Sequence, residues 1–202
     1  SSGTVSDVAV SGDGTIHCLV RRDPLIDMRA PAIINLSPEG KVIAEFGDEV
    51  ADAHMLATTQ DDAIVVVDRD AHEVIEFRNR RRSGSLGVRH GPGEPFNHPT
   101  GIAVAPDGSR YVCEGYAGHT VWRFASDGTE LARWGAPGSG PGEFINAHAI
   151  WIRPDSSVVV VDRENDRLQV FDPNGELLHI WTGFVKPLDV WGDAKGRIYV
   201  SD

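Results

Sequence analysis

The sequence predicts an all-β protein, a β-propeller built from four-stranded antiparallel blades, and three observations carry this prediction. A turn followed by a β-rich run recurs along the chain, beginning at Asp13, Asp61, Asp107, Asp155 and Lys195. The successive copies begin 48, 46, 48 and 40 residues apart, a period typical of propeller blades and of long helical repeats. The runs are rich in valine, isoleucine and aromatic residues and are bounded by Asp-Gly turns, so strands are favoured over helices.

The third copy of the repeat contains all four strands of one blade. Strands are expected over residues 101–105, 110–114, 120–124 and 130–135. The turns between the first two and the last two of these strands carry the Asp-Gly signal of tight hairpins. One repeat therefore corresponds to one antiparallel blade.

A single blade cannot bury both of its faces, so blades stack around an axis and four to eight of them close a ring. Four blades and the start of a fifth are present, and we expect a further blade and a half beyond Asp202 to complete a six-bladed ring. The expected arrangement is one domain over residues 1–202, with blade 1 at about 4–48, blade 2 at about 52–87, blade 3 at about 98–136, blade 4 at about 146–183 and a partial blade 5 at about 186–202.

The composition is that of a turn-rich globular protein, with 41% apolar residues and 22 glycines among 202 residues. The net charge of −11 argues against a nucleic-acid partner, because nucleic-acid binding depends on lysine and arginine neutralising phosphates. No stretch reaches the length of a membrane span, so no membrane partner is expected. Cys18 and Cys113 fall in equivalent strands of blades one and three, which argues against a disulfide. Localisation stays open, with the cytoplasm favoured.

One segment departs from this acidic background. Residues 78–89 are rich in arginine and are expected to form a basic loop between blades two and three. The expectation for this loop is a solvated connection, and contact with a phosphate or an acidic partner is the alternative.

Two histidines occupy the same position of the repeat. The last strand residues before the blade links are Val20, Asp68, Glu114, Asp162 and Asp202, here called the markers. Counting back fourteen residues from each marker gives Ser6, His54, Thr100, His148 and Leu188. This position opens the innermost strand of each blade, so a third histidine in blade six would complete three metal ligands with an open coordination position, as in catalytic zinc sites. The alternatives are a chance coincidence, or histidines that cap strand ends through hydrogen bonds.

Arginines and a tyrosine follow the markers at the same end of the strands. The two residues past the markers of blades one to four are Arg21-Arg22, Arg69-Asp70, Gly115-Tyr116 and Arg163-Glu164. Arginine can hold a carboxylate by two parallel hydrogen bonds, and a tyrosine beside a metal ion can act as a base. This set indicates an anionic small substrate beside a histidine-bound cation. The alternative is a surface network in which Arg163 pairs with Glu164 or Asp166.

Three blades contain motifs that point to one family. The segments are residues 141–148 (PGEFINAH) with 161–171 (VDRENDRLQVF), residues 98–104 (HPTGIAV) with 114–116 (EGY), and residues 16–23 (IHCLVRRD). They resemble blades four, three and one of the peptidyl-α-hydroxyglycine α-amidating lyases, six-bladed propellers of the NHL-repeat class. The resemblance runs over nearly the whole chain.

The resemblance implies a set of site residues and a reaction. His54 and His148 are implied to be zinc ligands, with a third histidine outside this chain. Tyr116 is implied to be the catalytic base, with Arg21 and Arg163 completing the site. In that family the C–N bond of an α-hydroxyglycine breaks to give an amide and glyoxylate. A structural calcium ion on the propeller axis, held by backbone carbonyls, is also implied.

The chain departs from the family pattern at several positions. Ala117 follows Tyr116, where the family has a disulfide-bonded cysteine. Arg69 and His98 have no counterpart in the family motif, and we expect them to bind substrate, with a structural role as the alternative for His98. The expected function is a metal-dependent lyase that cleaves a C–N or related bond at a hydroxylated carbon of a small-molecule or peptide substrate bearing a carboxylate. The alternative is a non-catalytic NHL propeller that serves as a scaffold for a protein partner or a ligand.

Overall fold

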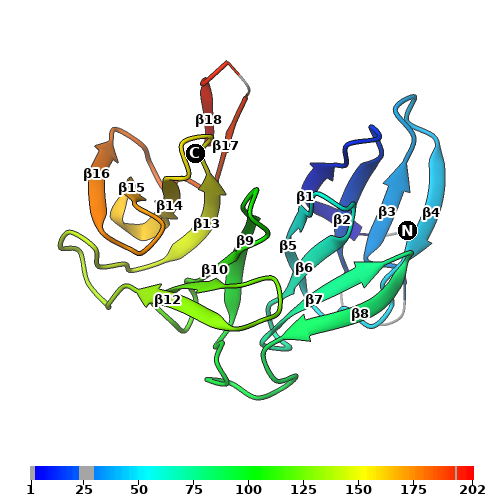
Figure 1. The fold of residues 1–202 in the computed structure, drawn as a ribbon, viewed down its shortest axis with the longest axis horizontal. Coiled ribbons are helices and arrows are strands. Elements are labelled where there is room, and N and C mark those ends of the chain that lie inside the picture. The colour runs from blue at the N-terminus through cyan, green and yellow to red at the C-terminus, as the bar shows by residue number, and fades with distance from the viewer. Residues whose placement is uncertain (1–2, 23–29, 194) are drawn as a thin grey trace. The chain divides into compact units, whose positions relative to one another are not determined.

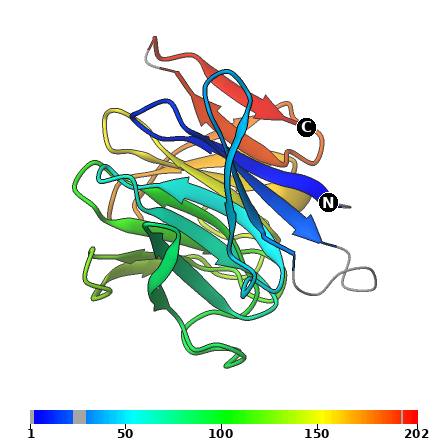
Figure 2. The same cartoon turned by 90° about the vertical axis from the view of Figure 1, so that its right-hand side faces the viewer.

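The computed structural model describes residues 3–22, 30–193 and 195–202. Residues 23–29, which the sequence assigns to blade 1 and which include the last residue of its family motif, lie outside the described residues. The described residues form strands β1 to β18 and one short 3-10 helix, so the all-β prediction is confirmed (Figures 1 and 2). None of the helical structure in these ranges is long and apolar enough to cross a membrane.

The strands form four antiparallel sheets of four strands and one sheet of two. The chain divides into two compact units, residues 1–96 and 97–202. The first unit holds two blades, formed by β1 (Gly3–Val10), β2 (Ile16–Arg22), β3 (Ile33–Leu36) and β4 (Val42–Phe46), and by β5 (Ala53–Thr58), β6 (Ile64–Asp68), β7 (Glu73–Arg78) and β8 (Arg81–Leu86).

The second unit holds two further blades and a hairpin. Its strands are β9 (Pro99–Val104), β10 (Arg110–Glu114), β11 (Val121–Phe124) and β12 (Glu130–Trp134), then β13 (Ala147–Ile152), β14 (Val158–Asp162), β15 (Arg167–Phe171) and β16 (Leu177–Thr182), and finally β17 (Asp189–Gly192) and β18 (Ile198–Ser201). The 3-10 helix Arg163–Asn165 follows β14, and the β17–β18 hairpin is red in Figure 2. The prediction of four-stranded antiparallel blades is confirmed.

The first strand of each blade packs against the first strand of the next blade within its unit. In the first unit β1 contacts β5, and in the second unit β9 contacts β13, which in turn contacts β17. The second strands β6, β10 and β14 are buried along their whole length, whereas the fourth strands β4, β8 and β12 are mostly exposed. The first strands are therefore the inner ones, and they position any side chain at their beginning.

Apolar side chains from adjacent blades form one core in each unit. In the first unit Leu19, Ile33 and Phe77 are among the fully buried members, and in the second unit Phe144 and Phe171 are. Each such side chain contributes roughly 1.5–3 kcal/mol on burial. Packing between neighbouring blades therefore contributes to the stability of the inner strands.

The Asp-Gly signal in the repeat forms the hairpin turns between the first two strands. Asp107 Oδ1 accepts a hydrogen bond of 2.8 Å from the backbone N–H of Ser109, and Asp155 Oδ1 accepts one of 3.0 Å from that of Ser157. The hydroxyls of Ser109 and Ser157 donate to the same oxygens, and these side-chain bonds, together with the backbone bonds, lower the pKa values of both aspartates. Gly108 follows with a φ of 82°, a left-handed conformation that glycine adopts without steric cost.

The basic segment of residues 78–89 is not a loop, so this prediction was wrong. Residues Arg81–Leu86 form β8, the exposed outer strand of the second blade. Arg82 Nη2 lies 2.7 Å from Oε2 of Glu73, and Arg89 Nη1 lies 2.5 Å from Oε1 of the same buried glutamate. The arginines are therefore partners of this carboxylate as well as part of a charged surface.

Candidate functional site

A β-bulge lies at the same position in the first strand of all four blades. The residue before each bulge pairs with the marker of its blade: Val5 with Val20, Ala53 with Asp68, Pro99 with Glu114 and Ala147 with Asp162. The bulged positions include Ser6, His54, Thr100 and His148. Counting back from the markers therefore identifies structurally equivalent residues. A bulge redirects a side chain from the regular pleat, and bulges are common beside active sites.

Buried marker carboxylates hold the chain that leads into each bulge. Asp68 Oδ1 accepts a 2.9 Å hydrogen bond from the backbone N–H of Asp52, two residues before His54. Asp162 Oδ1 accepts a 3.5 Å hydrogen bond from the backbone N–H of Asn146, two residues before His148. Both marker aspartates are fully buried, and burial raises the pKa of Asp68. The sequence analysis used these markers only for counting, whereas they position the backbone of the site.

His148 is buried and its ring is fixed from one side. Its Nδ1 lies 2.7 Å from the backbone oxygen of Leu188, at the start of the β17–β18 hairpin. A carbonyl oxygen only accepts hydrogen bonds, so Nδ1 carries the proton and Nε2 of the neutral ring presents a lone pair. Burial lowers the pKa of His148 below its usual value of 6.5. The neutral imidazole, which is the form that binds metals, is therefore favoured.

Tyr116 lies against the open nitrogen of His148. Its hydroxyl is 3.3 Å from Nε2, and the two rings meet edge to face with centroids 6.0 Å apart. Because Nε2 is the acceptor, the tyrosine hydroxyl donates this hydrogen bond. The structure thus brings together two of the residues that the sequence selected, and their catalytic roles stay predictions.

Gly115 determines where Tyr116 lies. A Cβ atom at residue 115 would collide with Oδ1 of Asn146 and lie 2.7 Å from the backbone oxygen of Ala147. Only glycine leaves room for this close approach of blade three to blade four. The sequence analysis assigned no role to Gly115 or Asn146, because the signal is a contact between blades.

Arg163 pairs with its neighbour in sequence. Its Nη1 lies 2.6 Å from Oε1 of Glu164, whose other oxygen is 3.3 Å from Nζ of Lys186. Of the two partners that the sequence left open, Glu164 is the one observed. Nε of Arg163 is buried and has no hydrogen-bond partner among the described residues, and neither has Oδ1 of Asn146. Arg163 therefore retains an unused donor.

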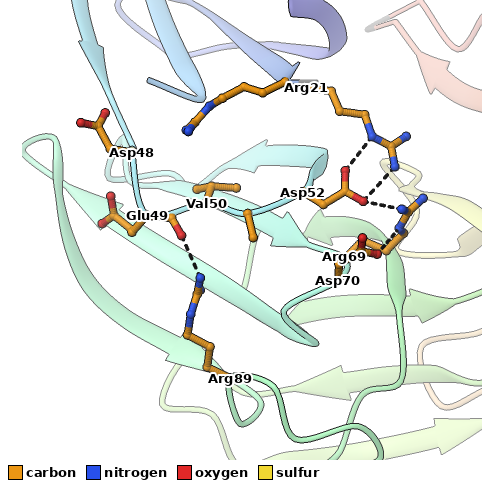
Figure 3. Close-up of a pocket in the computed structure, with 10 residues that line it drawn as sticks. Arg21, Asp48, Glu49, Val50, Asp52, Arg69, Asp70 and Arg89 are labelled. Carbon is orange, nitrogen blue, oxygen red and sulfur yellow. Dashed lines mark hydrogen bonds and ion pairs between the residues drawn. The ribbon is translucent and has the colours of Figure 1, made fainter. Parts of the chain in front are cut away.

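The first unit contains an arginine cluster beside a cavity of about 570 Å³ (Figure 3). Asp52 accepts from Arg21 at both oxygens, with Nε 2.6 Å from Oδ1 and Nη2 2.8 Å from Oδ2. Arg69 Nη2 lies 2.5 Å from Oδ2 of the same carboxylate, and Arg69 Nε lies 2.8 Å from Oδ1 of Asp70. Two arginines predicted to bind an anion therefore already share a carboxylate of the protein.

His54 and His98 are the remaining predicted residues. His54 is buried at the bulge of β5 in the first unit, whereas His148 belongs to the second unit. His98 precedes β9 with a φ of 56°, and its Nδ1 lies 2.9 Å from Oδ1 of Asn97. Within the ranges that the structure describes, no group of three or more histidine, cysteine or acidic side chains is arranged to hold a metal. Zinc and calcium binding therefore stay predictions.

The chain is similar to two groups of curated proteins. It is 31% identical over 194 residues to a probable peptidyl-alpha-hydroxyglycine alpha-amidating lyase of Caenorhabditis elegans, covering 84% of this chain and 55% of that protein. It is 34% identical over 89 residues to NHL repeat-containing protein 3 of mouse, covering 43% of this chain and 26% of that protein. The chain thus spans about half of the first relative's length and less of the second. No protein-family model matches it.

Solved structures share the fold at low sequence identity. A streptogramin B lyase superposes with a TM-score of 0.76 at 15% identity, over 98% of this chain and 61% of that one. Virginiamycin B lyase from Staphylococcus aureus gives 0.72 at 15% identity, over 98% and 62%. At this identity the likeness shows the fold alone. Fold and repeats together define a β-propeller of the NHL-repeat class. Within that class, the resemblance to the peptidyl-α-hydroxyglycine α-amidating lyases is confirmed.

Proposed function

We propose that the protein is a metal-dependent lyase that cleaves the C–N bond of an α-hydroxyglycine-type substrate, releasing an amide and glyoxylate. The observation that carries the proposal is the contact of Tyr116 with His148. The tyrosine hydroxyl lies 3.3 Å from Nε2 of His148. This nitrogen carries a lone pair because the ring proton is on Nδ1, which donates to the backbone oxygen of Leu188. The 31% identity to an amidating lyase adds independent support.

The residues present fit a bound transition metal. In the proposal His54 and His148 each supply one imidazole nitrogen, and the third ligand is a histidine outside this chain. Their equivalence at the bulge of a first strand supports a common role, and the Leu188 carbonyl is the kind of outer partner that fixes a metal-binding histidine. When bound, zinc would lower the pKa of a coordinated substrate hydroxyl. A calcium ion held by backbone carbonyls is a separate structural proposal.

In the proposal, side chains of this chain move the proton and orient the substrate. Tyr116 acts as the base: its own hydroxyl proton leaves to solvent, and its oxygen takes the proton of the substrate hydroxyl. The oxygen electrons then form the aldehyde C=O of glyoxylate as the C–N bond breaks, and the amide nitrogen leaves with that electron pair and gains a proton. Arg163, with its unused Nε donor, and Arg21 hold the substrate carboxylate, and Arg69 and His98 also bind the substrate.

The proposal is tested by incubating the protein with zinc and N-benzoyl-α-hydroxyglycine and measuring glyoxylate and benzamide. We expect both products in equal amounts, and a loss of about 10²–10⁴-fold in rate for Tyr116→Phe, which removes the base and keeps the ring. His179→Ala, at an exposed histidine of β16, is the control and should keep wild-type activity. A protein that forms neither product, or a Tyr116→Phe variant with full activity, would contradict the proposal and favour the scaffold alternative.

A further inference from the structure

Arg21, Asp52 and Arg69 form a three-membered ion cluster within the first unit (Figure 3). Asp52 uses both oxygens on Arg21 and shares one of them with Arg69. The two guanidinium groups balance the carboxylates of Asp52 and of the half-exposed Asp70, so the cluster offers an anion N–H donors but no net positive charge. The cluster lies on the wall of the cavity, so a ligand can reach it.

Two backbone hydrogen bonds fix the position of Asp52. Its N–H donates to Asp68 at 2.9 Å, and its carbonyl oxygen accepts a 3.0 Å hydrogen bond from the N–H of Arg69. The Asp52 side chain is 11% exposed, whereas that of Arg21 is 38% exposed. The carboxylate is thus an inner anchor, and Arg21 is accessible from the solvent side.

The anchor determines which edge of Arg21 is available. Among the described residues, Arg21 uses Nε and Nη2 on Asp52, and no contact is made by Nη1. A long arginine side chain loses rotamer freedom when it binds a ligand, and a side chain already held in place loses less. Asp52 therefore holds the Arg21 side chain in place and leaves its Nη1 group available to donate to a ligand.

We infer that Asp52 is a positioning residue that joins Arg21 and Arg69 into one two-arginine site for the carboxylate of the substrate. The inference rests on the proposed function for the identity of the anion, and it deepens that proposal by assigning specificity to the first unit. Blade four lacks this device, because the residue equivalent to Asp52 is the uncharged Asn146.

The test compares Asp52→Asn with Asp70→Asn, using glyoxylate as the carboxylate probe in a calorimetric titration and the α-hydroxyglycine substrate in turnover. Both variants remove one carboxylate from Arg69, but only the first also releases Arg21. For Asp52→Asn we expect glyoxylate binding about tenfold weaker and a KM about tenfold higher, with kcat changed less than about twofold. For Asp70→Asn we expect changes of less than about twofold in all three.

Unchanged glyoxylate binding in Asp52→Asn would overturn the inference, and so would tighter binding, which would mean that Asp52 competes with the ligand. If Asp52→Asn fails to fold in a thermal melt, Arg69→Gln decides instead. That variant keeps the Arg21–Asp52 pair and should weaken glyoxylate binding about threefold, and unchanged binding there would exclude a two-arginine site.

The outcomes separate this inference from the proposed function. The wild-type protein could show no lyase turnover while its glyoxylate binding still depends on Asp52 and not on Asp70. That result would contradict the proposed lyase function and support the anion site. Lyase turnover with a KM that is unchanged in Asp52→Asn would support the proposed function and contradict the anion site.

Discussion

Blades two and four have the same framework but differ in the charge beside their arginines. Equivalent residues are His54 and His148, Asp68 and Asp162, Arg69 and Arg163, Asp70 and Glu164, and Asp52 and Asn146. The last pair is the exception, a carboxylate in blade two and an amide in blade four. Arg69 consequently pairs with two carboxylates, whereas Arg163 pairs with one and keeps a buried Nε without a partner among the described residues. One substitution in the repeat thus changes how much donor capacity an arginine retains.

In the same two blades the buried marker aspartates have different ion-pair partners. Five residues past the marker, blade two has Glu73 and blade four has Arg167. Arg167 Nε lies 2.9 Å from Oδ2 of Asp162, whereas Asp68 reaches the more distant Arg89, at 3.3 Å. Burial raises the pKa of Asp68. The backbone bonds to the marker are common to both blades, so they, more than the ion pairs, are what the framework requires.

The largest expected effect comes from removing a bulge histidine. If His54 and His148 are both metal ligands, each change to alanine should lower lyase activity by more than about 100-fold, because even outer partners of metal ligands contribute up to about that much. Steady-state turnover with saturating zinc measures this, with His179→Ala as the control. Loss of activity in only one of the two histidine variants would break the proposed equivalence of blades two and four.

A smaller effect, on stability, is expected at residue 115, where blade three differs from blades two and four. Gly115 occupies the position of Arg69 and Arg163, and Gly115→Ala should cost about 1–3 kcal/mol in unfolding free energy, because the new methyl group collides with Asn146. Gly84→Ala, where nothing lies within 4 Å, should change stability by less than about 0.5 kcal/mol. Urea unfolding compares the two variants. Equal stabilities would show that the close contact is not required.

Replacing the amide of Asn146 by a carboxylate would make blade four resemble blade two at this position. Asn146→Asp introduces an acid at the position equivalent to Asp52. The charge summed over Arg163, Lys186, Glu164 and residue 146 therefore falls from +1 to zero, and the KM for a carboxylate substrate should rise about three- to tenfold. Kinetics at two salt concentrations measure the change, which should diminish at the higher one. An unchanged KM would mean that Arg163 does not hold the substrate carboxylate.

The smallest effect concerns pH. Burial lowers the pKa of His148 below 6.5, so the unfolded chain takes up a proton before the folded one does. The contribution of the neutral ring to stability is complete above about pH 6.5 and is lost as the pH falls through and below that value. Urea unfolding from neutral to mildly acidic pH should therefore show a smaller decline in His148→Gln than in wild type, with His179→Gln behaving as wild type. Equal declines in all three would contradict the assigned ionisation.

The framework was predictable from the sequence because its signals are local and repeated. The Asp-Gly turns and valine-rich runs predicted the strands, and the marker count identified equivalent positions that the structure shows to be bulges. The outer strand β8 was misread as a loop because five of its six residues are exposed and polar or glycine, without apolar alternation. The pairing of Arg21 with Asp52, 31 residues and one blade away, has no local signal. The sequence thus identified the residue types of the site, whereas their partners required the structure.

The most direct test of the central claim is the metal content of the protein, measured by elemental analysis for wild type, a His54→Ala/His148→Ala double variant and His179→Ala. We expect about one zinc per chain in the wild type and in His179→Ala, and almost none in the double variant, because two ligands are lost together. A protein that binds no metal, or binds it equally well without both histidines, would contradict the metal-dependent lyase.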